Sequence, residues 1–323
     1  MKKALIASTA LVLTAGVAAA DVTISGYGRT GVIYYENDTP DLNETQIISR
    51  LRMNIDASTS TDQGVDFGAR FRLQWDQNRN DDRGQRGALN AGKLWVTASG
   101  LTVEVGNVDT AFDSTGLRGA TELGAYDRSV GFSDRANTFF GYKTGEYSLD
   151  ETKRVGVRAI YTIADVKLQA SYVDPDQTGL NEDGVGLKEE LGFAADYTWN
   201  DRLELSGAFV LDGNGIEDND IFFLGARYAV IENARIGLNY SNADNDSVVE
   251  DGQTFALYGD YTLADGLTNI EAYIAHNDVD TNETDNAFGI GVNYDLGGAR
   301  LGASLQRDYD ELVTADFGVR FDF

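Results

Sequence analysis

Apolar and polar residues alternate at every second position through most of this chain, and this pattern limits its possible folds more than any other feature. In the run from 64 to 76, apolar side chains occupy the odd positions, and polar residues or glycine occupy the even ones. Successive side chains of a β-strand point to opposite faces. Each run is therefore predicted to be a strand that faces an apolar medium on one side and water on the other.

Sixteen such runs follow one another. They cover residues 22–35, 47–59, 64–76, 90–99, 101–107, 153–163, 166–174, 190–199, 202–212, 221–230, 234–243, 253–263, 267–277, 285–295, 299–308 and 313–323. Most are about ten residues long, the length that a tilted strand needs to cross a bilayer. Short turns alternate with longer acidic connections, as in an up-and-down barrel of an outer membrane. The sequence predicts an all-β fold, a 16-stranded antiparallel transmembrane β-barrel. A secreted soluble all-β protein is the alternative.

Residues 1–20 have the pattern of an export signal. Lys2 and Lys3 precede an apolar stretch, and Ala18, Ala19 and Ala20 form a small-residue cleavage site. We expect cleavage before Asp21, which leaves 21–323 as a single barrel domain. A retained membrane anchor is the alternative, but the apolar run is short for one.

Composition argues against several other functions. The chain has no cysteine and a single histidine, His276, which excludes thiolate metal sites and any site that needs two imidazoles. A net charge of −26 disfavours nucleic-acid binding. No serine motif accompanies His276, so we expect no enzyme activity.

The connection 107–152 is the exception to the loop pattern. It spans 46 residues and carries apolar side chains that would be poorly placed in water. These are Phe112, Leu117, Leu123, Tyr126, Phe132, Phe139 and Phe140. We therefore expect this loop, which follows the fifth strand, to fold into the barrel. Residues 137–142 could form a seventeenth strand, but two termini on one side require an even number, so we assign them to the loop.

Three segments resemble the general diffusion porins of alphaproteobacteria, the Rhodobacter-type sixteen-stranded trimeric porins. They are residues 21–32 (DVTISGYGRTGV), 104–107 (EVGN), and the C-terminal region with 294–298 (YDLGG) and 315–323 (ADFGVRFDF). The resemblance covers essentially all of 21–323. It implies a homotrimer in the outer membrane, and a pore narrowed by the long loop opposite an arginine cluster. The loop interior matches that family in length and acidity more than residue by residue.

Strand parity places one set of arginines on the inner face: Arg29, Arg50, Arg52, Arg70, Arg72 and Arg158. The loop offers carboxylates to oppose them: Asp109, Asp113, Glu122, Asp127 and Asp134. We predict that these two sets form the basic wall and the acidic loop of a pore constriction. Opposed rows of fixed charge create a field across a pore that sorts solutes by charge and polarity. The alternative for each residue is an ordinary solvated position.

The acidic outer loops suggest a second role. One cluster contains Asp244, Asp246, Glu250 and Asp251, and another contains Asp212, Glu217, Asp218 and Asp220. Carboxylates are the ligands that Ca²⁺ prefers, although neither cluster has EF-hand spacing. Resemblance to a family that binds calcium also favours a Ca²⁺ site, and divalent ions would link such loops to lipopolysaccharide.

The sequence thus predicts a water-filled outer-membrane channel for passive diffusion of small hydrophilic solutes and ions, with no required cofactor. The acidic chain predicts a preference for cations, and the arginine wall is the argument against it. One alternative is a substrate-specific channel. Another is a structural or adhesive barrel that conducts nothing. The trimer is implied by the resemblance, and residues 78–90 are a candidate contact with a neighbouring subunit.

Overall fold

The computed structural model describes residues 21–36, 43–77, 88–90, 92–121, 123–131, 138–144, 154–179, 187–244 and 252–323. The predicted export signal at 1–20 lies outside this part of the chain. Within it, no helix has both the length and the apolar character needed to span a bilayer.

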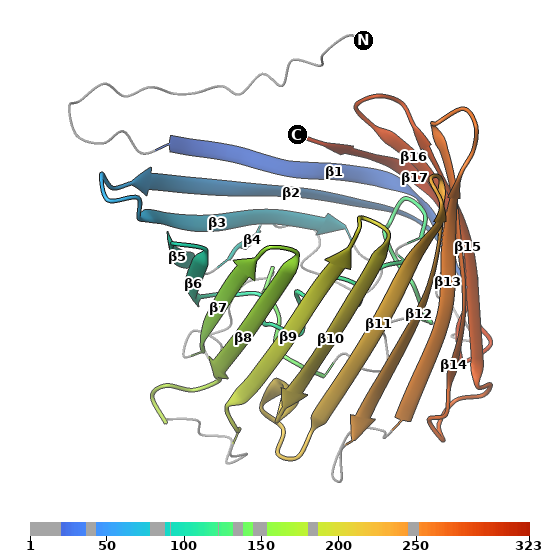
Figure 1. Ribbon diagram of the computed structural model, residues 1–323. Helices are drawn as coiled ribbons and strands as arrows, with labels where there is room; N and C mark the ends of the chain where they lie inside the picture. Colours follow the sequence, from blue (N-terminus) through green and yellow to red (C-terminus); the bar gives the residue numbers. More distant parts are fainter. Residues whose placement is uncertain are drawn as a thin grey trace.

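The described chain is a closed antiparallel β-barrel of sixteen strands (Figure 1). Seventeen strand segments make up these sixteen barrel strands, because β4 and β5 are two pieces of one strand. The segments are β1 (Asp21–Tyr35), β2 (Thr45–Ser60), β3 (Asp66–Gln77), β4 (Ala88–Leu89), β5 (Lys93–Ala98), β6 (Leu101–Gly106), β7 (Val155–Ile163), β8 (Val166–Asp174), β9 (Glu190–Trp199), β10 (Leu203–Leu211), β11 (Asp220–Ile231), β12 (Ala234–Asp244), β13 (Gly252–Thr262), β14 (Thr268–Asn277), β15 (Asn286–Asp295), β16 (Arg300–Arg307) and β17 (Val313–Asp322). A short 3₁₀ helix, η3, covers Gly213–Gly215. The ring closes because β1 pairs with both β2 and β17.

The fourth barrel strand differs from the prediction of one run over 90–99. It consists of two pieces, β4 and β5, which both pair with β3, and Asn90 follows the first piece. Asn90 is not part of either strand piece and makes two other hydrogen bonds. Its backbone N–H donates to the carbonyl of Arg72 at 2.9 Å, and its side-chain amide donates to the carbonyl of Lys143 in the long loop.

The two faces of the wall carry the two halves of the alternating pattern. Apolar side chains such as Leu51, Leu238 and Ile290 are exposed on the outside, while polar side chains point inward. Closure pairs the last strand with the first, so the ring has no free edge strand, as a lipid environment requires. The turn at Asn200 and Asp201 joins β9 to β10 with both residues at positive φ, 51° and 53°, as tight hairpins need.

The long connection between β6 and β7 lies inside the ring (Figure 1). Its side chains Phe112, Leu117 and Leu123 are almost fully buried, which confirms that the loop folds into the barrel. Glycines on the wall make room for it. A Cβ at Gly302 on β16 would lie 2.6 Å from the backbone nitrogen of Ala125, so the loop tip rests directly on the backbone of that strand. The described residues 138–142 form no strand.

Candidate functional site

Four arginines form a continuous row across the point where the barrel closes. Arg300 on β16 is opposite Arg320 on β17, Arg320 is opposite Arg29 on β1, and Arg29 is opposite Arg50 on β2. Four guanidinium groups on neighbouring inner positions repel one another unless carboxylates lie between them. The row therefore needs acidic partners.

Asp127 of the long loop is the main partner of this row. Its carboxylate pairs with Arg300 and Arg320, and it lies 3.9 Å from Arg29. The bridge between Leu123 and Arg128 forms the loop tip that carries Asp127, and Asp127 itself has a φ of 49°. One loop carboxylate thus lies among guanidinium groups from three strands and reduces their mutual repulsion.

Tyr126 holds the tip against the opposite strands. Its hydroxyl donates to the carbonyl of Ile48 on β2 at 2.8 Å, and its carbonyl accepts from Arg29. Burial raises the pKa of Tyr126 to about 12, compared with about 10 for an exposed tyrosine. The hydroxyl therefore keeps its proton, and the hydrogen bond to β2, at physiological pH.

The other predicted arginines bind mainly to the wall. Arg70 forms a two-pronged pair with Asp56, at 2.6 and 2.9 Å. Arg50 pairs with Asp76. Arg52 donates to the side-chain oxygen of Gln74 at 2.5 Å and Arg72 to that of Asn54 at 2.8 Å. The carboxylates of Asp56 and Asp76 on the wall thus take the place of the loop carboxylates that we expected as partners.

The return leg of the loop also contacts this wall. The guanidinium carbon of Arg72 lies 4.2 Å from the ring centre of Tyr142, a stacking distance that is favourable for a cation over an aromatic face. Among the described residues, Arg52 and Arg72 make no ion pair. They are therefore the least neutralised cations of the predicted wall.

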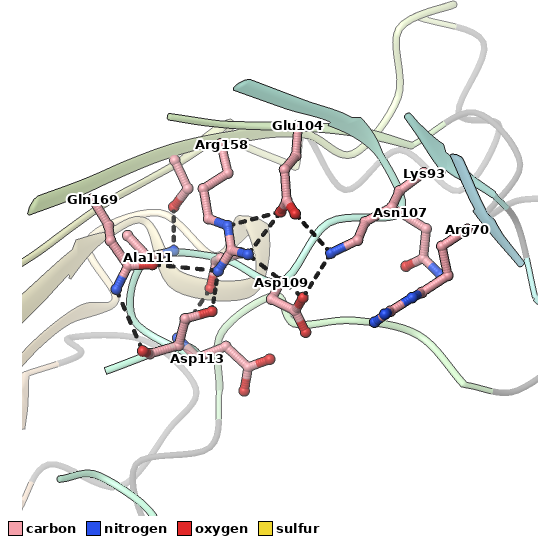
Figure 2. Close-up of polar contacts among 12 residues, drawn as sticks. Arg70, Lys93, Glu104, Asn107, Asp109, Ala111, Asp113, Arg158 and Gln169 are labelled. Carbon is pink, nitrogen blue, oxygen red and sulfur yellow. Dashed lines mark hydrogen bonds and ion pairs between the residues drawn. The ribbon is translucent and has the colours of Figure 1, made fainter. Parts of the chain in front are cut away.

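A second charged cluster lies where the loop leaves β6 (Figure 2). The carboxylate of Glu104 accepts from Lys93 at 2.9 Å and from Arg158 at 2.7 Å. Asp109 completes the cluster, 3.2 Å from Lys93 and 3.7 Å from Arg158. Arg158 also donates to Ser114, so the cluster ties the first part of the loop to β5, β6 and β7. We call these four residues, Lys93, Glu104, Asp109 and Arg158, the Glu104 cluster. Arg158 makes none of the contacts of the Asp127 group, which consists of Asp127, Arg29, Arg300 and Arg320.

The remaining predicted residues are more scattered. Asp113 pairs within the loop with Arg118 at 3.1 Å. Glu122 and Asp134 lie outside the described residues. Asp244 ends β12, while Asp246, Glu250 and Asp251 lie outside the described part. The described residues contain no cluster of three or more acidic or histidine side chains arranged to hold a metal ion.

The arrangement is therefore a closed barrel with a polar inner face, crossed by a loop that charged groups hold at its tip and at its base. The family model described as Gram-negative porin matches residues 7–311. The chain belongs to the Gram-negative porin family.

Two curated relatives support this assignment. The porin of Fuscovulum blasticum is 41% identical over 308 residues, with 94% of this chain and all of the relative covered. The porin of Rhodobacter capsulatus is 27% identical with the same coverage. Among solved structures, a triple mutant of Rhodopseudomonas blastica porin has a TM-score of 0.83 and 40% identity, and the match covers 94% of this chain and all of that one. The porin described here is thus an outer-membrane channel, as its sequence predicted.

Some charged residues of this porin were missed by sequence reasoning. Arg300 and Arg320 belong to the arginine row, and Lys93 and Glu104 belong to the cluster at the base of the loop. The alternating pattern of the last strand does place Arg320 on the inner face of the barrel. Recognising its place in the row requires the register between β17 and β1, which a strand pattern does not contain.

Proposed function

We propose that this porin is a passive channel with a preference for cations, and that the Asp127 group, the wall arginines and the Glu104 cluster set its charge bias at the constriction. The observation that carries the proposal is the pairing of the arginines. Arg50, Arg70 and Arg158 each have a carboxylate partner. Arg29 shares Asp127 with Arg300 and Arg320. The positive wall is therefore largely neutralised.

The charge of the rest of the chain then determines whether the channel prefers cations or anions. Its net charge is −26, and carboxylates are frequent in the outer connections. A pore lined by excess carboxylate concentrates cations and repels anions. Arg52, Arg72 and the one positive charge that Asp127 and Asp322 leave uncompensated among Arg29, Arg300 and Arg320 reduce this bias. They do not reverse it, because three cations stand against a much larger excess of acids.

The expected result is a positive cation bias in a planar bilayer. The chain 21–323, folded in detergent, is inserted and its reversal potential is measured under a KCl gradient. A reversal potential of the sign for K⁺ preference, reduced at high ionic strength through screening, supports the proposal. Anion preference would refute it. Transport that saturates with one solute class would instead favour a substrate-specific channel.

We also propose the features that the family resemblance implies: cleavage of residues 1–20, assembly as a homotrimer, and contact of the acidic outer loops with lipopolysaccharide through Ca²⁺. The segment 78–90 is the proposed subunit latch, and its last part contains β4, a piece of the fourth barrel strand. Deletion of residues 78–87, which keeps β4, is expected to lower the temperature at which trimers dissociate on a native gel, while the single barrels stay folded. Trimers that resist heat equally well without 78–87 would exclude this role.

A further inference from the structure

A hollow of about 550 Å³ lies on the inner face of β12 to β17, at the end of the barrel where the short turns join the strands. Leu267 of a short turn lines it, together with Asn269 and Glu271 of β14 and Asn293 and Asp295 of β15. The hollow is separate from the Glu104 cluster, which lies on β5 to β7. Its volume is typical of a site for a small organic molecule.

The guanidinium groups in the hollow already have carboxylate partners. Arg235 donates to Asp260 at 2.9 Å, and Arg300 pairs with Asp127 of the loop tip. Asp322, at the edge of the hollow, is paired with Arg320 at 3.0 Å. The positive charges of this region are therefore neutralised before any solute arrives.

Two carboxylates of the hollow lack such partners. Glu271 accepts a long hydrogen bond, 3.4 Å, from the side-chain amide of Asn293. Asp295 accepts from the backbone N–H of Gly297 at 2.7 Å. Within the described residues, neither makes an ion pair. Glu271 and Asp295 thus give the hollow a net negative charge, and the side-chain amides of Asn269 and Asn293 stand in register between them.

The spacing of the two carboxylates selects the shape of a ligand. Glu271 is opposite Gly291. Asp295 lies four residues further along β15, a distance of about 14 Å at about 3.4 Å per residue. Single metal ions cannot span this distance, and the described residues hold no three-carboxylate cluster. A linear molecule with an ammonium group at each end fits the two charges, and Leu267 offers an apolar contact for its methylene chain.

We propose that this hollow is a binding subsite for linear organic diammonium ions, with one ammonium at Glu271 and the other at Asp295. The inference deepens the proposed cation preference and rests on it. A diamine held there lies on the permeation path and interrupts the ion current.

The test is the single-channel current with 1,8-diaminooctane added on the short-turn side. We expect transient interruptions, and about fivefold weaker block in Glu271→Gln and in Asp295→Asn, as removal of one charge at contact distance in water predicts. 1,3-Diaminopropane also carries two ammonium groups at neutral pH but cannot span the two carboxylates, so it should block less. The matched control is Asp165→Asn, which removes one charge from a short turn at the same end, between β7 and β8.

Several outcomes would overturn the inference. These are equal block by the two diamines, an equal effect of Asp165→Asn, or no block at all. The unblocked conductance and the reversal potential of each variant are measured in the same bilayer. A cation-selective channel that diamines do not block would contradict this inference alone. An anion-selective channel would contradict the proposed function itself.

Discussion

Replacing Asp127 with Asn is expected to shift the selectivity of the channel towards anions by about fivefold. The substitution keeps the size of the side chain and removes one negative charge. Asp127 pairs with Arg300 and Arg320 and lies 3.9 Å from Arg29. Two unit charges about 4 Å apart in water interact by about 1 kcal/mol, which corresponds to the stated ratio. The measurement is the reversal potential under a KCl gradient.

Asp113→Asn is the matched control for this experiment. Asp113 belongs to the same loop and also pairs with an arginine, Arg118, but that arginine is part of the loop itself. The control changes the net charge equally and leaves the arginine row untouched. A larger shift in Asp113→Asn than in Asp127→Asn would show that the loop tip does not control selectivity.

The barrel could be predicted because its signal repeats in every strand. Alternation at period two sets the face of each side chain, and a slip of one residue would turn all apolar side chains of a strand towards water. The burial of the long loop could be predicted for a related reason, because side chains such as Phe112 and Leu123 gain from leaving water.

The carboxylates that pair with the wall arginines could also be predicted from the sequence, through the register of one hairpin. The hairpin of β2 and β3 closes at Ser60 and Asp66. Counting outward from this pair places Asp56 opposite Arg70 and Arg50 opposite Asp76. A turn as short as this one therefore determines cross-strand partners, and with them the ion pairs of the wall.

The role of Asp127 among the loop acids could not be predicted in this way. Asp113 and Asp127 are chemically identical and lie in the same loop. They differ because the bridge between Leu123 and Arg128 turns the chain at the tip, and because barrel closure brings β16 and β17 beside β1. Both features depend on contacts between residues far apart in the chain, which a local sequence pattern does not reveal.

The largest loss of stability is expected for Glu104→Gln. Glu104, Lys93 and Arg158 are all at least 93% buried, and Glu104 is the closest carboxylate to both cations. Removal of one partner from a buried ionic group typically costs about 3–5 kcal/mol, because the remaining charge stays desolvated. We expect the urea midpoint of unfolding, followed by intrinsic fluorescence, to fall accordingly with an unchanged slope.

Glu204→Gln is the control for this substitution. Glu204 lies on the inner wall and pairs with Arg227, donor to acceptor at 3.1 Å, but its side chain is 33% exposed. Exposed pairs contribute about 0–1 kcal/mol, so a small shift of the midpoint is expected. Equal shifts in the two variants would show that burial does not determine the strength of these pairs.

A second substitution separates the two causes of the expected loss. In Glu104→Gln, Asp109 is left to neutralise both Lys93 and Arg158. Adding Lys93→Met removes one of these cations and keeps a similar volume. If the loss comes from an unpaired buried charge, the double variant should be more stable than Glu104→Gln alone, which a double-mutant cycle measures directly. If the loss comes from the missing hydrogen bonds, the second substitution should add to it, and the base of the loop would then depend on geometry more than on charge balance.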